Sequence, residues 1–220
     1  MNCWVIVPVK RLSAAKSRLA PNLTLCQRRE MVCLLLIRTL GILASEKRIA
    51  GILVVGKDRA VRSITANHGA VFVQEKTNGG LNRALAYAAR EAVRRGADSI
   101  LVLPADLPLV KQSDIAGALK PAGKPPFLRI APDHTGHGTN LLLSAPPGLI
   151  RFSFGEDSFQ RHVAAARRAG ARVSVIRRAS LAQDLDCPDD LARLYRVGLK
   201  ESTKNTKENR KNTKKEKFLK

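Results

Sequence analysis

Short apolar runs rich in Val, Ile and Leu alternate with helical patterns along this 220-residue chain, and this alternation limits the possible folds more than any other feature. Such runs are typical of strands buried on both faces of a parallel sheet. The predicted strands are Trp4 to Pro8, Ile49 to Val55, Val71 to Gln74, Ile100 to Leu103, Leu128 to Ala131, Leu141 to Ser144 and Val173 to Ile176. We therefore expect an α/β fold with a mostly parallel, Rossmann-like sheet in three layers.

Helical patterns fill most of the gaps between these runs. The predicted helices are Thr24 to Ala44, Arg59 to Asn67, Leu81 to Arg95, Ser113 to Leu119, Ser158 to Ala169 and Asp189 to Val197. The first opens with Thr24-x-x-Gln27, a capping-box spacing in which both side chains satisfy free backbone N–H groups. The last follows Pro188, a residue favoured in a first helical turn.

The length suits one well-buried core, so we expect a single domain over residues 1–198. The formal net charge is +21, and residues 199–220 hold nine Lys or Arg against three Glu. This segment is rich in Lys, Asn and Thr and almost without apolar residues, which predicts a disordered basic tail. The positive charge of the rest suits anionic small molecules as well as it suits nucleic acid.

The four cysteines show no CxxC spacing and no His at zinc-finger distance. Their pattern therefore indicates neither a structural metal site nor a disulfide framework. The longest apolar run, Met31 to Ile37, lies between charged residues and is far too short to span a membrane. No signal-peptide pattern is recognised at the start of the chain. We therefore expect a cytoplasmic protein without a membrane partner.

A basic loop follows the first predicted strand. It carries Lys10, Arg11, Lys16 and Arg18. In an open α/β sheet, ligands bind beyond the carboxyl ends of the strands, so four cations at this position predict a cradle for a polyphosphate.

Three carboxylates are candidates for binding magnesium. Asp106 lies in Pro104-Ala-Asp-Leu-Pro108, just past the carboxyl end of a predicted strand, and Asp184 and Asp186 occupy alternate positions of an extended segment. Alternate side chains of such a segment point the same way. An isolated Asp in a turn most often caps the turn, but three acidic groups in a basic chain favour one or two hard cations on nucleotide phosphates.

Two glycine-containing segments offer donors for an anion. Gly136-His-Gly-Thr-Asn140 leads into a predicted strand, and its alternative interpretation is an ordinary hairpin connection. Phe154-Gly-Glu-Asp-Ser158 precedes a helix with Ser158 as the expected N-cap, and its alternative interpretation is simple capping. His134 and His137 form too weak a pair for metal ligands, and His162 is expected on a solvent-facing or packing face of its helix.

Asn78-Gly-Gly-Leu-Asn82 opens the third predicted helix, where amides could contact a purine edge or a phosphate. Neither GxxxxGK[ST] nor GxGxxG occurs in the chain. The sequence thus contains neither a Walker P-loop nor a standard dinucleotide fingerprint.

Five segments together resemble the 2-phospho-L-lactate guanylyltransferase family. They are VPVKRLSAAKSRLA, LPADLPL, APDHTGHGTN, SFGEDSFQRH and DLDCPDDL, in order and with similar spacing. The resemblance implies a fold of the nucleotide-diphospho-sugar-transferase type. It also implies transfer of GMP from GTP to 2-phospho-L-lactate, phosphoenolpyruvate or 3-phospho-D-glycerate, with release of pyrophosphate, in coenzyme F-420 biosynthesis.

The resemblance also implies roles for individual residues. Mg²⁺ would be bound by Asp106, Asp184 and Asp186, the triphosphate of GTP by Lys10, Lys16 and Arg18, and the phospho-acid by Thr139, Gly155 and Ser158. From the residues themselves we further expect catalytic roles for Asp106 and Lys16 and a contact of Asn82 with GTP. The chain departs from the family at Cys187, where Thr is common, and in its basic tail. The residues alone do not decide which phospho-acid is the substrate.

Two alternatives remain at this point. Another nucleotidyltransferase of the same fold, making a molybdopterin dinucleotide or a CDP-linked lipid precursor, would usually begin with a glycine-rich loop, which this chain lacks. A nucleic-acid-binding protein would explain the net charge. The 4% aromatic content and the absence of a nucleic-acid motif argue against it except through the tail.

Overall fold

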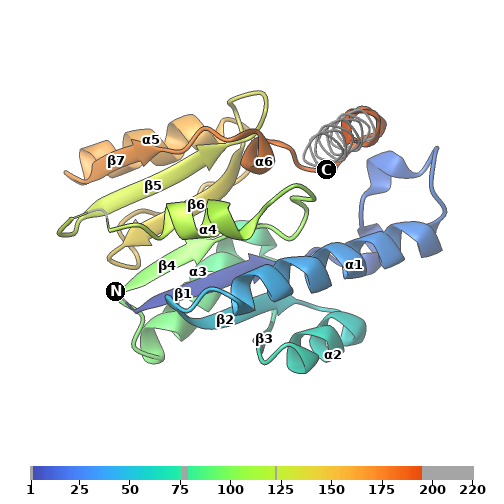
Figure 1. The fold of residues 1–220 in the computed structure, drawn as a ribbon, viewed down its shortest axis with the longest axis horizontal. Coiled ribbons are helices and arrows are strands. Elements are labelled where there is room, and N and C mark those ends of the chain that lie inside the picture. Colours follow the sequence, from blue (N-terminus) through green and yellow to red (C-terminus); the bar gives the residue numbers. More distant parts are fainter. Residues whose placement is uncertain (1, 76–78, 122, 195–220) are drawn as a thin grey trace, which may run out of the picture.

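A seven-stranded sheet in the order β3-β2-β1-β4-β6-β5-β7 forms the centre of the protein (Figure 1). The computed structural model describes residues 2–75, 79–121 and 123–194. The strands are β1 (Cys3–Pro8), β2 (Ile49–Gly56), β3 (Val71–Gln74), β4 (Ser99–Val102), β5 (Phe127–Pro132), β6 (Thr139–Ala145) and β7 (Arg172–Val175). All seven predicted strands are therefore confirmed, with ends that shift by one or two residues.

The long helices agree with the prediction about as closely as the strands do. They are α1 (Leu25–Ala44), α2 (Arg59–Asn67), α3 (Gly80–Arg94), α4 (Gln112–Ala118), α5 (Ser158–Arg168) and α6 (Ala179–Ala182), with 3-10 helices η1 (Leu12–Ala14) and η2 (Ser17–Leu19). The last predicted helix is present over 188–194, and its predicted residues 195–197 lie outside the described residues. Sequence patterns missed α6, η1 and η2, because elements of three or four residues are too short to show a period.

The capping box predicted for α1 is present. The backbone N–H of Gln27 donates to Thr24 Oγ1 at 3.3 Å, and the backbone N–H of Thr24 donates to Gln27 Oε1 at 2.9 Å. Each side chain thereby satisfies a donor that has no partner within the helix. This start fixes where the basic loop after β1 ends.

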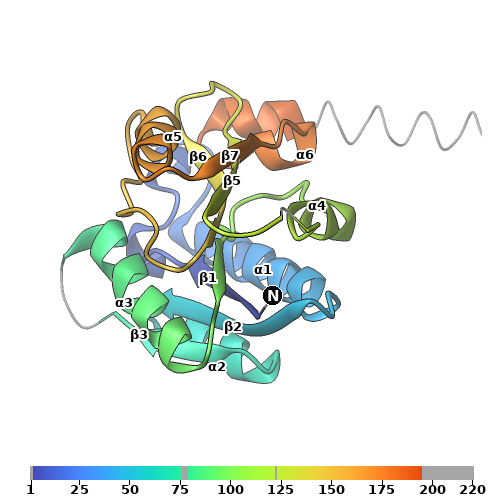
Figure 2. The ribbon, with the colours of Figure 1, turned by 90° about the vertical axis from the view of Figure 1, so that its left-hand side faces the viewer.

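Alternating side chains along the strands bury two faces of the sheet. In β1, Val5 and Val7 pack with residues of α1, α2, α4 and α6, whereas Ile6 packs with residues of α3 and α5. Side chains of successive strand residues point to opposite faces, so one strand contributes to both cores. Figure 2 shows α3 and α5 on one side of the sheet and α1 and α4 on the other. The predicted three-layer architecture is thus confirmed.

Strand β6 is the exception to the parallel arrangement. It pairs antiparallel with both β4 and β5, whereas β1 pairs parallel with β2 and β4, β2 with β3, and β5 with β7. The start of β6 therefore lies at the same sheet edge as the carboxyl ends of β1 and β4. The carboxyl ends of the parallel strands and the loop between β5 and β6 meet at that edge.

No helix among the described residues is long and apolar enough to cross a membrane. The basic tail predicted over 199–220 lies outside the described residues, and the domain boundary near residue 198 stays a prediction.

Candidate active site

A cavity of about 510 Å³ opens at this edge of the sheet. Because β1 and β4 are parallel neighbours, the loops that follow them lie side by side and form two of its walls. The loop after β1 supplies cations and the loop after β4 supplies Asp106. The cavity therefore brings opposite charges together from segments 90 residues apart in the chain.

Nine of the ten predicted site residues line this cavity. They are Lys10, Lys16, Arg18, Asp106, Thr139, Gly155, Ser158, Asp184 and Asp186. Lys10 and Arg18 are exposed, and among the described residues neither has an acidic partner. Arg11, the fourth cation of the predicted cradle, is exposed and does not belong to the lining.

Lys16 connects the basic loop to the carboxylates. Its Nζ lies 2.7 Å from Asp106 Oδ2 and 2.6 Å from Asp186 Oδ1, and the lysine side chain is only 9% exposed. Burial alone would lower the pKa of Lys16, but the two carboxylates outweigh it and raise the pKa above its ordinary value. Lys16 also has a left-handed backbone, with φ at 48°, which is uncommon for a residue with a side chain. The ion pairs offset this strain.

Asp184 and Asp186 reach the cavity on an extended segment that lies against Asp106. The backbone N–H of Leu185 donates to the carbonyl oxygen of Asp106 at 3.1 Å, which places the neighbouring carboxylates beside it. The sequence spacing did not establish this meeting of the three acids. The structure places all three acids in the lining of one cavity, while their metal-binding role stays a prediction.

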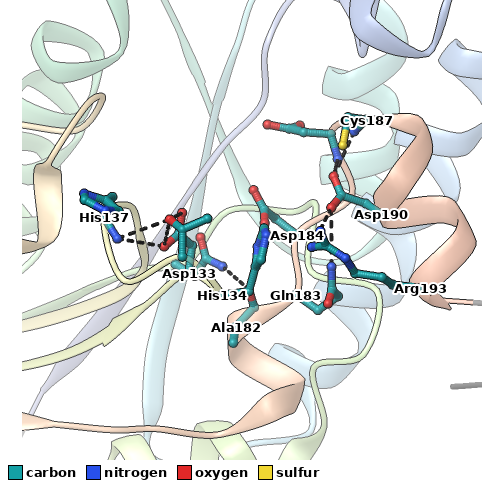
Figure 3. A network of polar contacts seen from close by, with 12 residues as sticks. Asp133, His134, His137, Ala182, Gln183, Asp184, Cys187, Asp190 and Arg193 are labelled. Atoms are coloured by element: carbon teal, nitrogen blue, oxygen red, sulfur yellow. Dashed lines mark hydrogen bonds and ion pairs between the residues drawn. The ribbon is translucent and has the colours of Figure 1, made fainter.

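Asp190 holds the backbone that carries Asp186, and Figure 3 shows its side chain beside Cys187 and Arg193. Its Oδ2 accepts the backbone N–H of Asp186 at 2.9 Å and that of Cys187 at 2.8 Å. Burial opposes its charge, but these donors and nearby Arg193 lower the pKa of Asp190. The carboxylate thus stays ionised and fixes the backbone on which Asp186 is carried.

The surroundings of Asp184 disfavour its ionised form. Burial, together with the charges of Asp106 and Asp186, raises its pKa from 3.8 to about 6. His134 Nδ1 lies 3.9 Å from Asp184 Oδ1. A positive charge near Asp184 would therefore be strongly favoured.

The donor chemistry of this corner fits a magnesium ion, since Mg²⁺ prefers carboxylate oxygens and phosphate oxygens. Burial, and after it the negative charges of Asp106 and Asp186, raise the pKa of Asp184, so a cation bound beside Asp184 would stabilise its ionised form. As the side chains stand, no three His, Cys, Asp or Glu residues within 2–75, 79–121 and 123–194 are gathered closely enough to hold a metal ion. The ammonium group of Lys16 lies between two of the acids in this conformation.

The opposite wall is formed by the start of β6 and the turn before α5. Asp133 shapes the β5–β6 loop, because its carboxylate accepts the backbone N–H of His137 at 3.0 Å (Figure 3). A Cβ atom at Gly138 would lie 2.7 Å from that carboxylate, so a glycine is needed there. The hairpin interpretation of this segment is correct, and the hairpin also delivers Thr139 to the cavity.

The turn before α5 differs in one detail from the expectation. Asp157, with a left-handed backbone, is the N-cap, and Ser158 is the first helical residue. Ser158 is 1% exposed, and Gly155 has φ at +121°, a conformation that side chains rarely adopt. The predicted N-cap role of Ser158 is therefore wrong, because the chain turns one residue earlier.

Asn82 is the predicted residue that the structure places elsewhere. Its Nδ2 donates to the carbonyl oxygen of Phe154 at 3.1 Å, and its Oδ1 accepts the backbone N–H of Phe154 at 2.8 Å. It lines a separate groove of about 870 Å³ between α3 and the segment after β6, whereas Leu81 lines the cavity. The amide thus supports the turn before α5, and its suggested contact with GTP has no support in this geometry.

Sequence reasoning missed the supporting residues. Asp190 stands three positions after Cys187, the spacing of a capping box, and this signal could have identified it. Asn140, suggested as an anion donor, instead donates from Nδ2 to the carbonyl oxygens of Leu181 and Ala182. The packing alternative for His162 is correct, since this side chain is fully buried on α5.

Comparison with known proteins adds sequence relatives. The family model described as "Guanylyl transferase CofC like" matches residues 3–214 and so extends into the basic segment. A phosphoenolpyruvate guanylyltransferase of Rubrobacter xylanophilus is 42% identical over 198 residues, which cover 90% of this chain and 96% of the relative. A protein of the same name from Sphaerobacter thermophilus is 39% identical over 194 residues, which cover 88% of this chain and 93% of the relative.

Solved structures support the fold. A proposed nucleotide-diphospho-sugar transferase from Desulfovibrio desulfuricans G20 superimposes with a TM-score of 0.72 at 19% identity, over 90% of this chain and 88% of that chain. A nucleotidyl transferase from Methanothermobacter superimposes with a TM-score of 0.64 at 17% identity, over 91% of this chain and 99% of that chain. These likenesses confirm the expected fold type.

Proposed function

Because the chain belongs to the family of guanylyl transferases described as CofC like, it is a nucleotidyltransferase, and we propose that it transfers GMP from GTP to phosphoenolpyruvate and releases pyrophosphate. The name shared by the relatives described above favours phosphoenolpyruvate over 2-phospho-L-lactate and 3-phospho-D-glycerate. One observation carries the proposal. A single cavity joins a basic loop, an acidic corner and a wall of small donors.

The basic loop supports binding of the triphosphate. Lys10 and Arg18 are exposed at the cavity, where charge-assisted hydrogen bonds to phosphate oxygens would place the nucleotide. Lys16 stays protonated, because two carboxylates raise its pKa, and its ammonium group can neutralise charge that develops on the phosphates. We assign the catalytic role expected for Lys16 to this neutralisation.

The opposite wall supports binding of the acid. Thr139, Gly155 and Ser158 present small donors and an accessible backbone, and bulky side chains are absent from these three positions. An acid held there faces the triphosphate across the cavity. The two reactants would thus be oriented before reaction, which is the main source of rate in phosphoryl and nucleotidyl transfer.

The chemical step needs no strong base from the protein. A phosphate oxygen of the acid, already anionic, forms a bond to the α-phosphorus of GTP. The bond from that phosphorus to its bridging oxygen breaks, and pyrophosphate leaves with the electron pair. A Mg²⁺ ion held by Asp106, Asp184 and Asp186 would neutralise phosphate charge when bound. The position of Asp106 in the turn between Pro104 and Pro108, at the cavity, supports this role.

We also propose a place in coenzyme F-420 biosynthesis, on the basis of the family. Cytosolic location and the predicted binding of Mg²⁺ belong to the same proposal. A rival that makes a CDP-linked lipid precursor would use CTP, and a rival that makes a molybdopterin dinucleotide would use another acceptor. Nucleotide and acceptor preference together therefore separate these rivals from this proposal.

Pyrophosphate release tests the function. The purified protein is incubated with Mg²⁺ and GTP and with each of the three phospho-acids in turn, and ATP and CTP replace GTP as controls. We expect release with GTP and phosphoenolpyruvate above all other pairs. No release with any pair, from folded protein, would contradict the proposal, and a preference for CTP would favour a rival of the same fold.

The Asp106→Asn variant tests the acidic corner. We expect at least about a 100-fold loss of turnover with Mg²⁺ while the protein stays folded, since the substitution removes a negatively charged carboxylate that would bind Mg²⁺ near the reacting phosphates. Glu30→Gln, which removes an exposed charge on α1, is the matched control and should keep full activity. Full activity of Asp106→Asn would overturn the metal assignment.

A further inference from the structure

A buried histidine stands directly behind the acid-binding wall. His162 of α5 is 0% exposed and is not among the residues that line the cavity. Its Nδ1 lies 3.2 Å from Thr139 Oγ1, and its Nε2 lies 2.9 Å from the backbone nitrogen of Ser153. The Phe154 ring packs edge-on against the imidazole, with centroids 4.9 Å apart.

These contacts determine which nitrogen carries the proton. A backbone N–H can only donate, so the Nε2 atom that faces Ser153 must be unprotonated. Burial, with a smaller contribution from Arg161, lowers the pKa of His162 to about 4, so the ring is neutral at pH 7. The single proton therefore resides on Nδ1 and is donated to Thr139 Oγ1.

The direction of this hydrogen bond has a consequence for the cavity. Thr139 Oγ1 accepts from the ring, so the hydroxyl proton must point to another acceptor. Among the described residues no other hydrogen-bond partner of this hydroxyl is found, and Thr139 lines the cavity. A hydroxyl that normally both donates and accepts is thereby turned into a donor that faces the ligand.

We infer that His162 is a positioning residue that fixes Thr139 as a hydrogen-bond donor to an anionic oxygen of the phospho-acid, an inference that rests on the proposed function. A carboxylate or phosphate oxygen is the acceptor that such a donor selects. The same ring holds Ser153, two residues before Gly155, so one side chain connects two parts of the acid-binding wall. The imidazole does not transfer protons, because both nitrogens are engaged and the ring is buried.

Two substitutions separate the two hydrogen bonds. His162→Gln places an amide oxygen near the position of Nε2 and removes the donor to Thr139, whereas His162→Asn places an amide nitrogen near Nδ1 and removes the acceptor for Ser153. We expect His162→Gln to raise the KM for phosphoenolpyruvate about 10-fold, the change that corresponds to one hydrogen bond, with an unchanged KM for GTP. His162→Asn should retain more of the affinity for the acid.

A double-mutant cycle with Thr139→Val excludes a merely structural effect. If His162 acts through the hydroxyl, the Thr139→Val variant and the double variant with His162→Gln should show the same KM for the acid. Additive effects of the two substitutions on the KM for the acid would overturn the inference. Equal increases in the KM values for the acid and for GTP would overturn it as well. Wild-type protein without activity would instead contradict the proposed function, so the two failures are distinguishable.

The tautomer is measured without any substrate. In histidine labelled with ¹⁵N, the spectrum of the wild-type protein at pH 7 should show a protonated Nδ1 and an unprotonated Nε2 for His162, and His162→Phe identifies the signal by its loss. A protonated Nε2 or a charged ring at pH 7 would overturn the inference. This measurement also applies if the activity variants fail to fold.

Discussion

Replacing Asp184 with Asn should make the protein more stable in the absence of divalent cations. The ionised carboxylate of Asp184 is partly buried beside two further acids, and these surroundings raise its pKa to about 6. Asn has nearly the same shape and carries no charge. The variant therefore removes the repulsion and keeps the packing, a trade of function against stability that is common in active sites.

The size of the effect follows from the pKa. The ordinary value is 3.8 and the value in the folded protein is about 6, and one pKa unit corresponds to about 1.4 kcal/mol. The ionised group therefore costs at most about 3 kcal/mol of folding free energy at pH 7. For a chain of this length, that corresponds to an increase in Tm of at most about 6–12 °C.

The pH dependence has a definite sign. The folded protein binds the proton of Asp184 more tightly than the unfolded chain does, so this group weakens folding as the pH rises from about 4 to about 6. The advantage of Asp184→Asn should thus be full at pH 7 and nearly absent at pH 4. Thermal unfolding with a chelator present, at both pH values, measures it.

Glu30→Gln provides the control, because it removes one exposed negative charge from a residue of α1 that does not line the cavity. Its Tm should match that of the wild-type protein at both pH values. A variant Asp184→Asn that is no more stable than wild type at pH 7, or whose advantage grows toward pH 4, would refute the reasoning.

Other substitutions test separate features. Lys16→Met should reduce guanylyl transfer at least about 100-fold and lower the unfolding free energy by about 2 kcal/mol at pH 7, since two carboxylates lose their shared cation. Gly51→Ala should cost about 1–3 kcal/mol in urea unfolding, because its Cβ would meet the Trp4 ring at 2.5 Å. Gly41→Ala, in open space on α1, should instead gain about 0.5–1 kcal/mol. Thr24→Ala should lose about 1 kcal/mol of helix capping by the same measurement.

The strands and long helices were predictable because hydrophobic burial imposes a period on them. The direction of β6 was not, since an apolar run in the middle of a sheet looks the same in either direction. The meeting of Lys16 with Asp106 follows from neighbouring parallel strands, so it was accessible to sequence reasoning.

Residues that act through other residues were harder to find. The amide of Asn82 points to Phe154 whereas the adjacent Leu81 lines the cavity, and a one-residue difference in helix phase decides this. The orientation of His162 depends on the backbone N–H of Ser153 in the segment before α5 and on Thr139 of β6, and no periodic pattern on α5 encodes these contacts. Sequence patterns therefore identified the residues that line the cavity more readily than those that support them.

The antiparallel β6 joins two halves of the sheet that carry different walls of the cavity. Only three residue pairs connect β4 with β6, from Ile100 with Ser144 to Val102 with Leu142. Under the proposed function, the triphosphate would bind to one half and the acid to the other, so a pair of bound reactants would crosslink them. We expect substrate binding to add to the cohesion of this junction and amide hydrogens at β4 and β6 to exchange more slowly when both substrates are bound.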